Sequence, residues 1–187
     1  MNVTDEALMG QVQEGDVRKL ALLFERHHRR LFNFFVHMNG DRSQSEDLVQ
    51  EVFFRILRYR GSYDASRPYS AWMFQIARNL HNEQVTRGRG DLRLVPSNEE
   101  QDQFPSGAPG IEETLLRRQE IGLLNRALDK LPDDKREVLV LSRFQNMKYE
   151  EIAQILGCEV GAVKVRVYRA IRALGQIYQE LSGEKAS

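Results

Sequence analysis

The sequence lacks most of the features that mark secreted or membrane-inserted proteins. It contains a single cysteine, Cys158, which cannot form a disulfide bond within the chain and fits a reducing cytoplasm. No apolar run approaches the length of a transmembrane helix. The N-terminus is acidic and lacks the apolar core of a signal peptide. We therefore expect a cytoplasmic protein without membrane insertion.

Residue clusters typical of metal sites and catalytic centres are also missing. His27 and His28 are adjacent, so they point to different sides of a helix, and no cysteine-rich motif follows them. Asp47 and Glu51 lie one helical turn apart, but no histidine, cysteine or glycine-rich phosphate loop lies beside them, which is typical of a solvated helix face. The sequence therefore predicts no catalytic residues, no metal, no cofactor and no small-molecule substrate.

Net charge is absent as well, because 27 basic residues balance 27 acidic ones. This balance argues against a protein that coats nucleic acid indiscriminately. The charge is unevenly placed, however: residues 91–110 hold four acidic residues and one basic residue, whereas residues 143–172 hold six basic and three acidic residues. A basic face on a neutral chain is typical of a protein that binds nucleic acid at one site.

The alternating apolar pattern of β-strands is absent from residues 5–87, where apolar side chains recur at spacings of three and four. We therefore expect this part of the chain to be nearly all helix. Ser45 is predicted to cap a helix over residues 46–59 through its hydroxyl group, and residues 69–87 are predicted to form a further helix.

A break in composition divides the chain. Residues 88–110 contain three prolines and show little periodicity, which predicts a flexible linker. Helical periodicity resumes beyond it, with Pro132 at a helix start, where proline is tolerated. The predicted fold is therefore all-α, with two small helical domains at residues 1–90 and 112–187 joined by a flexible acidic linker at residues 91–111.

Residues 149–174 predict a helix-turn-helix motif. Gly157 follows the first apolar stripe, where a left-handed helix cap is expected. The second helix has an apolar stripe and a basic side; the stripe comprises Val163, Val167, Ala170, Ile171 and Leu174, and the basic side comprises Lys164, Arg166, Arg169 and Arg172. In such motifs the second helix enters the DNA major groove. The alternative is an ordinary helical hairpin with a solvated basic face.

Residues 59–89 interleave aromatic, basic and amide side chains. Aromatic faces stack on unpaired bases while arginines follow the phosphates, and amide groups read the edge of a base taken out of the stack. The alternative is that the aromatic residues are core and the arginines are solvated. Trp72 fits both interpretations equally, since it shares a helix face with Ile76 and Leu80.

Together these segments resemble the extracytoplasmic-function group of sigma factors, the small two-domain initiation subunits of bacterial RNA polymerase. The resemblance runs from about Glu6 to Tyr178. Four motifs carry it, in the order found in the family: DLVQEVFFRIL at 47–57, AWMFQIARNLHNEQVTR at 71–87, LPDDKREVLVLSRF at 131–144 and YEEIAQILGCEVGAVKVRVYRA at 149–170.

The resemblance implies three sets of functional residues. Docking on the clamp helices of the largest catalytic polymerase subunit falls to Asp47, Gln50, Glu51 and Phe53, although the residue pattern places Phe53 in the core. Capture and melting of the −10 element fall to Tyr63, Asp64, Ser66, Arg67, Tyr69, Arg78 and Asn79. Recognition of the −35 element falls to Gly161, Ala162, Lys164, Val165, Arg166, Tyr168 and Arg169.

The resemblance also implies the partners and the role. These are core RNA polymerase, promoter DNA and an anti-sigma factor, and the role is promoter-specific initiation, often in a stress response. The alternative is a stand-alone helix-turn-helix regulator, which leaves the 47–57 helix unexplained. The chain departs from the family at Ala162 and Val165, where hydroxyl residues are common, and at Ser142, where arginine is common. These departures leave the preferred promoter sequence open, and Val165 could instead pack on a thymine methyl group.

Overall fold

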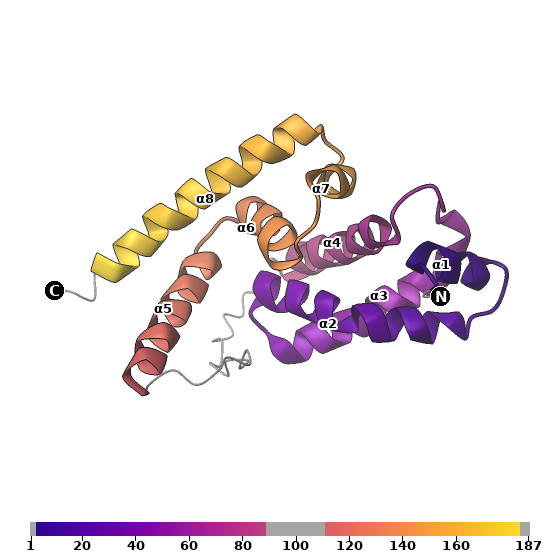
Figure 1. Cartoon of the computed structure of the whole chain (residues 1–187), viewed down its shortest axis with the longest axis horizontal. Coiled ribbons are helices and arrows are strands. Elements are labelled where there is room, and N and C mark those ends of the chain that lie inside the picture. Colours follow the sequence, from indigo (N-terminus) through magenta and orange to yellow (C-terminus); the bar gives the residue numbers. More distant parts are fainter. Residues whose placement is uncertain (1–2, 89–110, 184–187) are drawn as a thin grey trace.

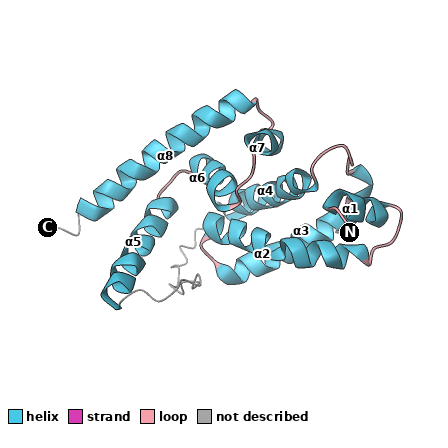
Figure 2. Ribbon diagram, in the orientation of Figure 1, coloured by secondary structure: helices cyan, strands magenta, loops and turns pink. Residues whose placement is uncertain are grey.

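The computed structural model describes residues 3–88 and 111–183, with side chains for residues 3–87 and 119–183. All regular structure in these residues is helical (Figures 1 and 2), which confirms the predicted all-α fold class. The elements are α1 (Asp5–Gln13), α2 (Lys19–Asn39), α3 (Arg42–Arg58), the 3₁₀-helix η1 (Arg60–Ser62), α4 (Tyr69–Gly88), α5 (Ile111–Asp129), α6 (Asp133–Leu139), the π-helix η2 (Val140–Phe144), α7 (Tyr149–Leu156) and α8 (Val160–Gly183). Apart from residue 111, the predicted linker lies outside the described residues.

The first helical unit is built from α1 to α4. Its helices bury aromatic and aliphatic side chains against one another, with Phe34, Phe35, Tyr69 and Phe74 fully buried at its centre. Edge-to-face contacts join Phe34 to Phe35 and to Phe74, with ring centroids 5.3 and 5.6 Å apart. The predicted helix at residues 69–87 is confirmed as α4, in which Trp72 and Ile76 are only partly buried.

The predicted start of the third helix was wrong. The helix begins at Arg42 and is capped by Asp41, whose carboxylate accepts a hydrogen bond from the Gln44 N–H at 2.9 Å. Ser45 lies inside the helix, fully buried, and its hydroxyl donates to the Asp41 carbonyl one turn earlier. Gly40 closes the preceding helix in a left-handed conformation with φ of 73°, so the break between the two helices is only two residues long.

The second helical unit contains α5 to α8. α6 and α7 pack against α8, η2 packs against α6 and α7, and the far end of α8 packs against α5 through Leu123, Ala127 and Leu181. α8 is one continuous helix of 24 residues and extends beyond residue 174, where the predicted motif ends. Its buried stripe contains Val163, Val167 and Ala170 as predicted, whereas Leu174 is half-buried and Ile171 is exposed.

The two units touch. α7 lies beside α4, η2 and α6 lie beside α2, and a single apolar cluster runs from one unit into the other (Figure 1). Within residues 3–88 and 111–183, no helix has both the length and the apolar character needed to cross a membrane.

Candidate nucleic-acid interface

The turn between α7 and α8 has the geometry of a helix-turn-helix motif. α7 begins with the Glu151 carboxylate accepting a hydrogen bond from the Lys148 N–H at 3.1 Å, and it ends at Gly157, which is left-handed with φ of 62°. The N–H of Cys158 then donates to the Ala153 carbonyl at 3.0 Å, and the half-buried Cys158 side chain packs against the core. The predicted glycine cap is therefore confirmed.

The predicted −35 residues share one side of α8. Gly161, Lys164, Val165, Arg166, Tyr168 and Arg169 are exposed, and Ala162 is half-buried. Val165 and Tyr168 present apolar surface, with 47% and 62% of their areas exposed. The Arg172 guanidinium lies 5.9 Å from the centre of the Tyr168 ring. This side of α8 therefore offers cations together with apolar surface, as major-groove contacts require.

Ser142 lies away from that surface. Its hydroxyl is buried and donates to the Val138 carbonyl at 2.7 Å, inside the α6–η2 segment. The neighbouring Arg143 is exposed and is the cation that this segment offers to solvent.

The aromatic residues that flank the 63–69 loop are buried in this structure. Tyr63 is 5% exposed and Tyr69 fully buried, and both rings pack against Trp72, with centroids 5.1 and 6.3 Å away. The Tyr63 hydroxyl donates to the Arg67 carbonyl at 2.9 Å, so it closes the loop on itself. In this conformation the two tyrosines position the loop, and neither offers a free face for a base.

Side chains of helix α1 hold the same loop in place through hydrogen bonds to its backbone. The Glu6 carboxylate accepts a hydrogen bond from the Tyr69 N–H at 3.0 Å, and the Gln13 side-chain amide donates to the Tyr63 carbonyl at 2.9 Å. The Asp5 carboxylate lies 2.6 Å from the His27 Nε2 atom, and the His27 ring packs on Tyr69. Burial lowers the pKa of His27, although Asp5 opposes that shift. None of these α1 contacts was predicted, because they join residues far apart in the sequence.

The polar residues of the loop remain available. Asp64, Ser66 and Arg67 are exposed, and the Asp64 carboxylate accepts hydrogen bonds from the Ser66 N–H and hydroxyl at 3.0 and 2.7 Å. This turn presents a small set of donors and acceptors beside α4.

Further along α4, a shallow depression is lined by polar side chains. Asn79 lies there as an exposed amide, and Asn82, another of the amide residues of the 59–89 segment, lies about one turn further along α4. Glu83, Thr86 and Arg87 complete the lining. Arg78 does not share this exposure, because its Nε–H donates to the Glu137 carboxylate of α6 at 2.8 Å.

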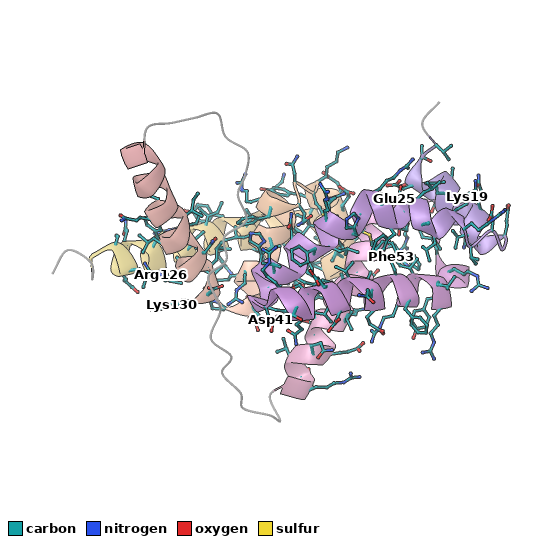
Figure 3. All side chains as sticks on the ribbon, turned by 90° about the horizontal axis from the view of Figure 1, so that it is seen from below. Lys19, Glu25, Asp41, Phe53, Arg126 and Lys130 are labelled. Atoms are coloured by element: carbon teal, nitrogen blue, oxygen red, sulfur yellow. The ribbon has the colours of Figure 1, made fainter. Side chains whose placement is uncertain are left out.

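The polar residues of the predicted docking face lie at the surface of α3. Asp47 and Gln50 are exposed, and Glu51 is half-exposed while it pairs with Arg55 at 2.9 Å. Arg55 also makes a two-pronged contact with Glu83 of α4, at 2.8 and 2.7 Å. Phe53 is buried as its pattern predicted: its ring meets Phe24 of α2 at 4.9 Å, between the two helices (Figure 3).

The exposed aromatic residue of this face is Phe54, which the sequence analysis did not single out. It is 59% exposed and lies one and two helical turns after Gln50 and Asp47. Helical spacing from those two residues could have identified it. Among the described residues, no group of three or more side chains is arranged to hold a metal ion.

Comparison with known proteins gives a consistent result. Residues 23–89 match the family described as Sigma-70 region 2, and residues 121–174 match Sigma-70, region 4. The ECF RNA polymerase sigma-E factor of Escherichia coli is 31% identical over 187 residues, covering 96% of each chain. The RNA polymerase sigma-H factor of Pseudomonas aeruginosa is 29% identical over 186 residues, also covering 96% of each chain.

Solved structures show the same similarity. The structure of CnrH in complex with the cytosolic domain of CnrY superposes with a TM-score of 0.72 at 25% identity, covering 94% of this chain and 97% of that one. The sigma factor RpoE in complex with the anti-sigma factor NepR from Bartonella quintana superposes with a TM-score of 0.67 at 23% identity, covering 87% and 98%, and supports the fold.

Proposed function

The chain belongs to the extracytoplasmic-function sigma factors, the RNA polymerase subunits that direct initiation at selected promoters, and we propose that three of its surfaces divide this work. The proposed domains are residues 1–90, for polymerase docking and the −10 element, and residues 112–187, for the −35 element. Residues 91–111 form the proposed linker. No catalytic chemistry is assigned to the chain, and its place of action is the cytoplasm, where RNA polymerase works.

The −35 element is assigned to the exposed side of α8. The observation that carries this assignment is the grouping of Lys164, Arg166 and Arg169 around the exposed Val165 and Tyr168. The cations supply phosphate contacts and base contacts, and Val165 is placed to meet a thymine methyl group. Gly161 and Ala162 at the start of the helix allow the backbone to approach the DNA closely.

The −10 element is assigned to the polar part of the 63–69 loop and to α4. Asp64, Ser66 and Arg67 surround a captured base, and Asn79 contacts the strand along α4. Arg78 supplies a phosphate contact once it is released from Glu137. Tyr63 and Tyr69 stabilise the conformation of the loop through their hydrogen bonds to Arg67 and Glu6.

Core polymerase is assigned to the exposed face of α3. Asp47, Gln50 and Glu51 supply polar contacts, with Phe54 at the centre of the face and Phe53 supporting it from the core. An exposed aromatic residue ringed by polar groups is typical of the residues that dominate binding energy at interfaces. Because the similar RpoE structure contains the anti-sigma factor NepR, we also propose that an anti-sigma factor binds this chain.

The test is reconstitution with bacterial core polymerase and a library of genomic promoter fragments, with run-off transcripts as the readout. We expect transcripts from a subset of fragments that share −10 and −35 sequences. An Arg166→Ala, Arg169→Ala variant should lose that selection while it still binds polymerase. Transcription from no fragment above the background of core polymerase would reject the assignment.

A further inference from the structure

Helix α4, which is assigned to −10 DNA, also contacts α6 and α7 of the second unit. Arg78 of α4 pairs with Glu137 of α6 at 2.8 Å, with only 29% and 10% of the two side chains exposed. Burial raises the pKa of Glu137, against the charges of Arg78 and Arg166. Arg166 belongs to the proposed −35 surface of α8. One buried carboxylate therefore pairs with a cation of the proposed −10 surface, while the charge of Arg166, from the proposed −35 surface, opposes the rise of its pKa.

A second carboxylate holds the start of the same helix. The Ser70 hydroxyl donates to Glu151 Oε1 at 2.6 Å, and the other oxygen of Glu151 accepts the Lys148 N–H that opens α7. The hydrogen bond from the Lys148 N–H holds the Glu151 carboxylate at the start of α7. The hydrogen bond from Ser70 to the same carboxylate therefore connects α7 to the residue that follows the 63–69 loop. The contact therefore lies beside the proposed base-capture residues.

Two further hydrogen bonds cross between the units. Arg30 of α2 donates to the Gln145 carbonyl at 3.1 Å and lies over the Phe74 ring at 5.4 Å. Arg136 of α6 donates to the Met38 carbonyl at 2.8 Å while it also binds carbonyls at the end of α5. These polar contacts surround the apolar cluster that both units share, in which side chains from α2, α4, η2 and α7 pack together.

We propose that the second unit is a built-in competitor of promoter DNA at α4: Glu137 occupies Arg78, which the DNA strand has to bind, and Glu151 holds the start of the same helix through Ser70. This rests on the proposed −10 assignment. A carboxylate and a phosphate bind a guanidinium in the same manner, and Arg78 is only 29% exposed while it pairs with Glu137, so a DNA strand reaches the whole guanidinium only when α6 moves away. The free protein is therefore closed and binds −10 DNA weakly, and promoter binding requires the two units to separate.

The test compares Glu137→Gln with Glu150→Gln in the full chain. Both changes remove one negative charge from the second unit, but Glu150 is exposed on α7 and Glu137 is buried against α4. The ligand is a single-stranded oligonucleotide carrying the −10 element of a promoter selected in the run-off experiment. If the closed form holds about 90% of free molecules, its release tightens the apparent dissociation constant about tenfold. We expect that gain in Glu137→Gln and less than a twofold change in Glu150→Gln.

Spin labels at Glu25→Cys and Gln179→Cys, in a Cys158→Ser background, report the separation of the units by electron–electron double resonance. We expect one narrow distance in the otherwise unchanged protein and added longer distances in Glu137→Gln. Since Glu137 is buried, its replacement could loosen the second unit itself. Ser70→Ala changes only the first unit and should lengthen the distances in the same direction.

A broad distance distribution before any substitution, or equal behaviour of Glu137→Gln and Glu150→Gln, would overturn the proposal. So would longer distances with no gain in oligonucleotide affinity. Run-off transcription by the unsubstituted protein separates these failures from failure of the proposed function, because it reports promoter selection whether or not the free protein is closed.

Discussion

Phe53 and Phe54 are neighbours in sequence, but Phe53 faces the core and Phe54 faces solvent. Phe53 is 6% exposed and meets the Phe24 ring at 4.9 Å, whereas Phe54 is 59% exposed beside Gln50. A helix turns about 100° per residue, so the two rings leave α3 in different directions. Within this motif Phe53 contributes to the core, and Phe54 is the aromatic residue available for the proposed docking.

Phe54→Ala should weaken binding to core polymerase by more than about fivefold, since truncating a central aromatic contact costs more than about 1 kcal/mol. Its thermal unfolding should be nearly unchanged, because the side chain is mostly exposed. Phe53→Ala should instead lower the free energy of unfolding by about 3–5 kcal/mol through the cavity left between α2 and α3. Fluorescence titration with core polymerase and chemical denaturation measure the two effects. Unchanged affinity in Phe54→Ala would remove it from the docking face.

Gln50→Ala combined with Glu51→Ala should also weaken polymerase binding while the fold is kept. Arg55 loses the Glu51 carboxylate but retains its two-pronged contact with Glu83, so the α3–α4 contact survives. Glu46→Ala, an exposed change on the same helix, is the matched control and should bind normally. If the double variant unfolds, these residues are structural; if it binds as the control does, docking lies elsewhere.

The sequence predicted the helices well because apolar spacing follows the period of the helix, and it placed the Gly157 cap correctly. It misplaced the start of α3 because Asp41 and Ser45 are both good caps, and only the left-handed Gly40 decides between them. It left open whether the aromatic residues of the 63–69 loop are core, because contacts such as that of Gln13 with the Tyr63 carbonyl join residues fifty positions apart.

The contact between the two units was likewise beyond the sequence. Glu137 reads as an ordinary solvated carboxylate on a short helix, and its partner Arg78 lies 59 positions away. Local patterns predict which face of a helix is apolar, but they do not say which other element covers it. The docking, −10 and −35 residues taken from the family resemblance remain predictions, and the next three experiments address the DNA contacts and the closed state.

Asn79→Ala should reduce open-complex formation on duplex promoters without changing the unfolding temperature, since Asn79 is exposed on α4. Extruding a base from the duplex costs roughly a few kcal/mol, and binding of the extruded base by the protein offsets that cost. We expect the Asn79 amide to supply part of this binding energy. Permanganate footprinting at matched polymerase occupancy measures strand opening. A template with a pre-melted bubble is the control, and the variant should recover there. Equal footprints on duplex DNA would remove Asn79 from the melting surface.

Lys164→Ala should weaken binding to all −35 sequences alike and reduce the salt dependence of binding by about one counterion, the result expected for a single phosphate contact. Arg169→Ala, if the arginine is bidentate to guanine, should instead relax specificity at one base pair by about 1–3 kcal/mol. Titrations of polymerase holoenzyme on matched promoters at several salt concentrations distinguish the two. A slope that neither variant changes would place the DNA contacts away from this side of α8.

Acidification should weaken the contact between the two units through two histidines, the half-buried His37 and the buried His81. The His37 ring lies 4.1 Å from Phe144, and both ring nitrogens of His81 are buried without a hydrogen-bond partner. Burial lowers the pKa of each, against the pull of Asp129 on His37 and of Asp133 on His81, while Arg136 adds to the lowering at His81.

The sign follows from proton uptake. Below the ordinary histidine pKa of about 6.5, the unfolded chain binds protons that the folded protein does not, so stability falls as pH falls. Each histidine contributes up to about 1.4 kcal/mol per pH unit within that window. Glu137, with its raised pKa, has the opposite sign at lower pH, so the useful quantity is a difference between variants.

His81→Leu removes one titrating group and the unpaired ring nitrogens together. It should raise the free energy of unfolding, because a buried unpaired polar group is lost, and it should flatten the dependence on pH between 7.5 and 5.5. His28→Leu is the control, since that residue is only half-buried on α2 and its Nδ1 already pairs with the Phe24 carbonyl. Chemical denaturation at four pH values gives both slopes. A slope in His81→Leu as steep as in the control would mean that His81 takes up its proton without loss of the folded contact.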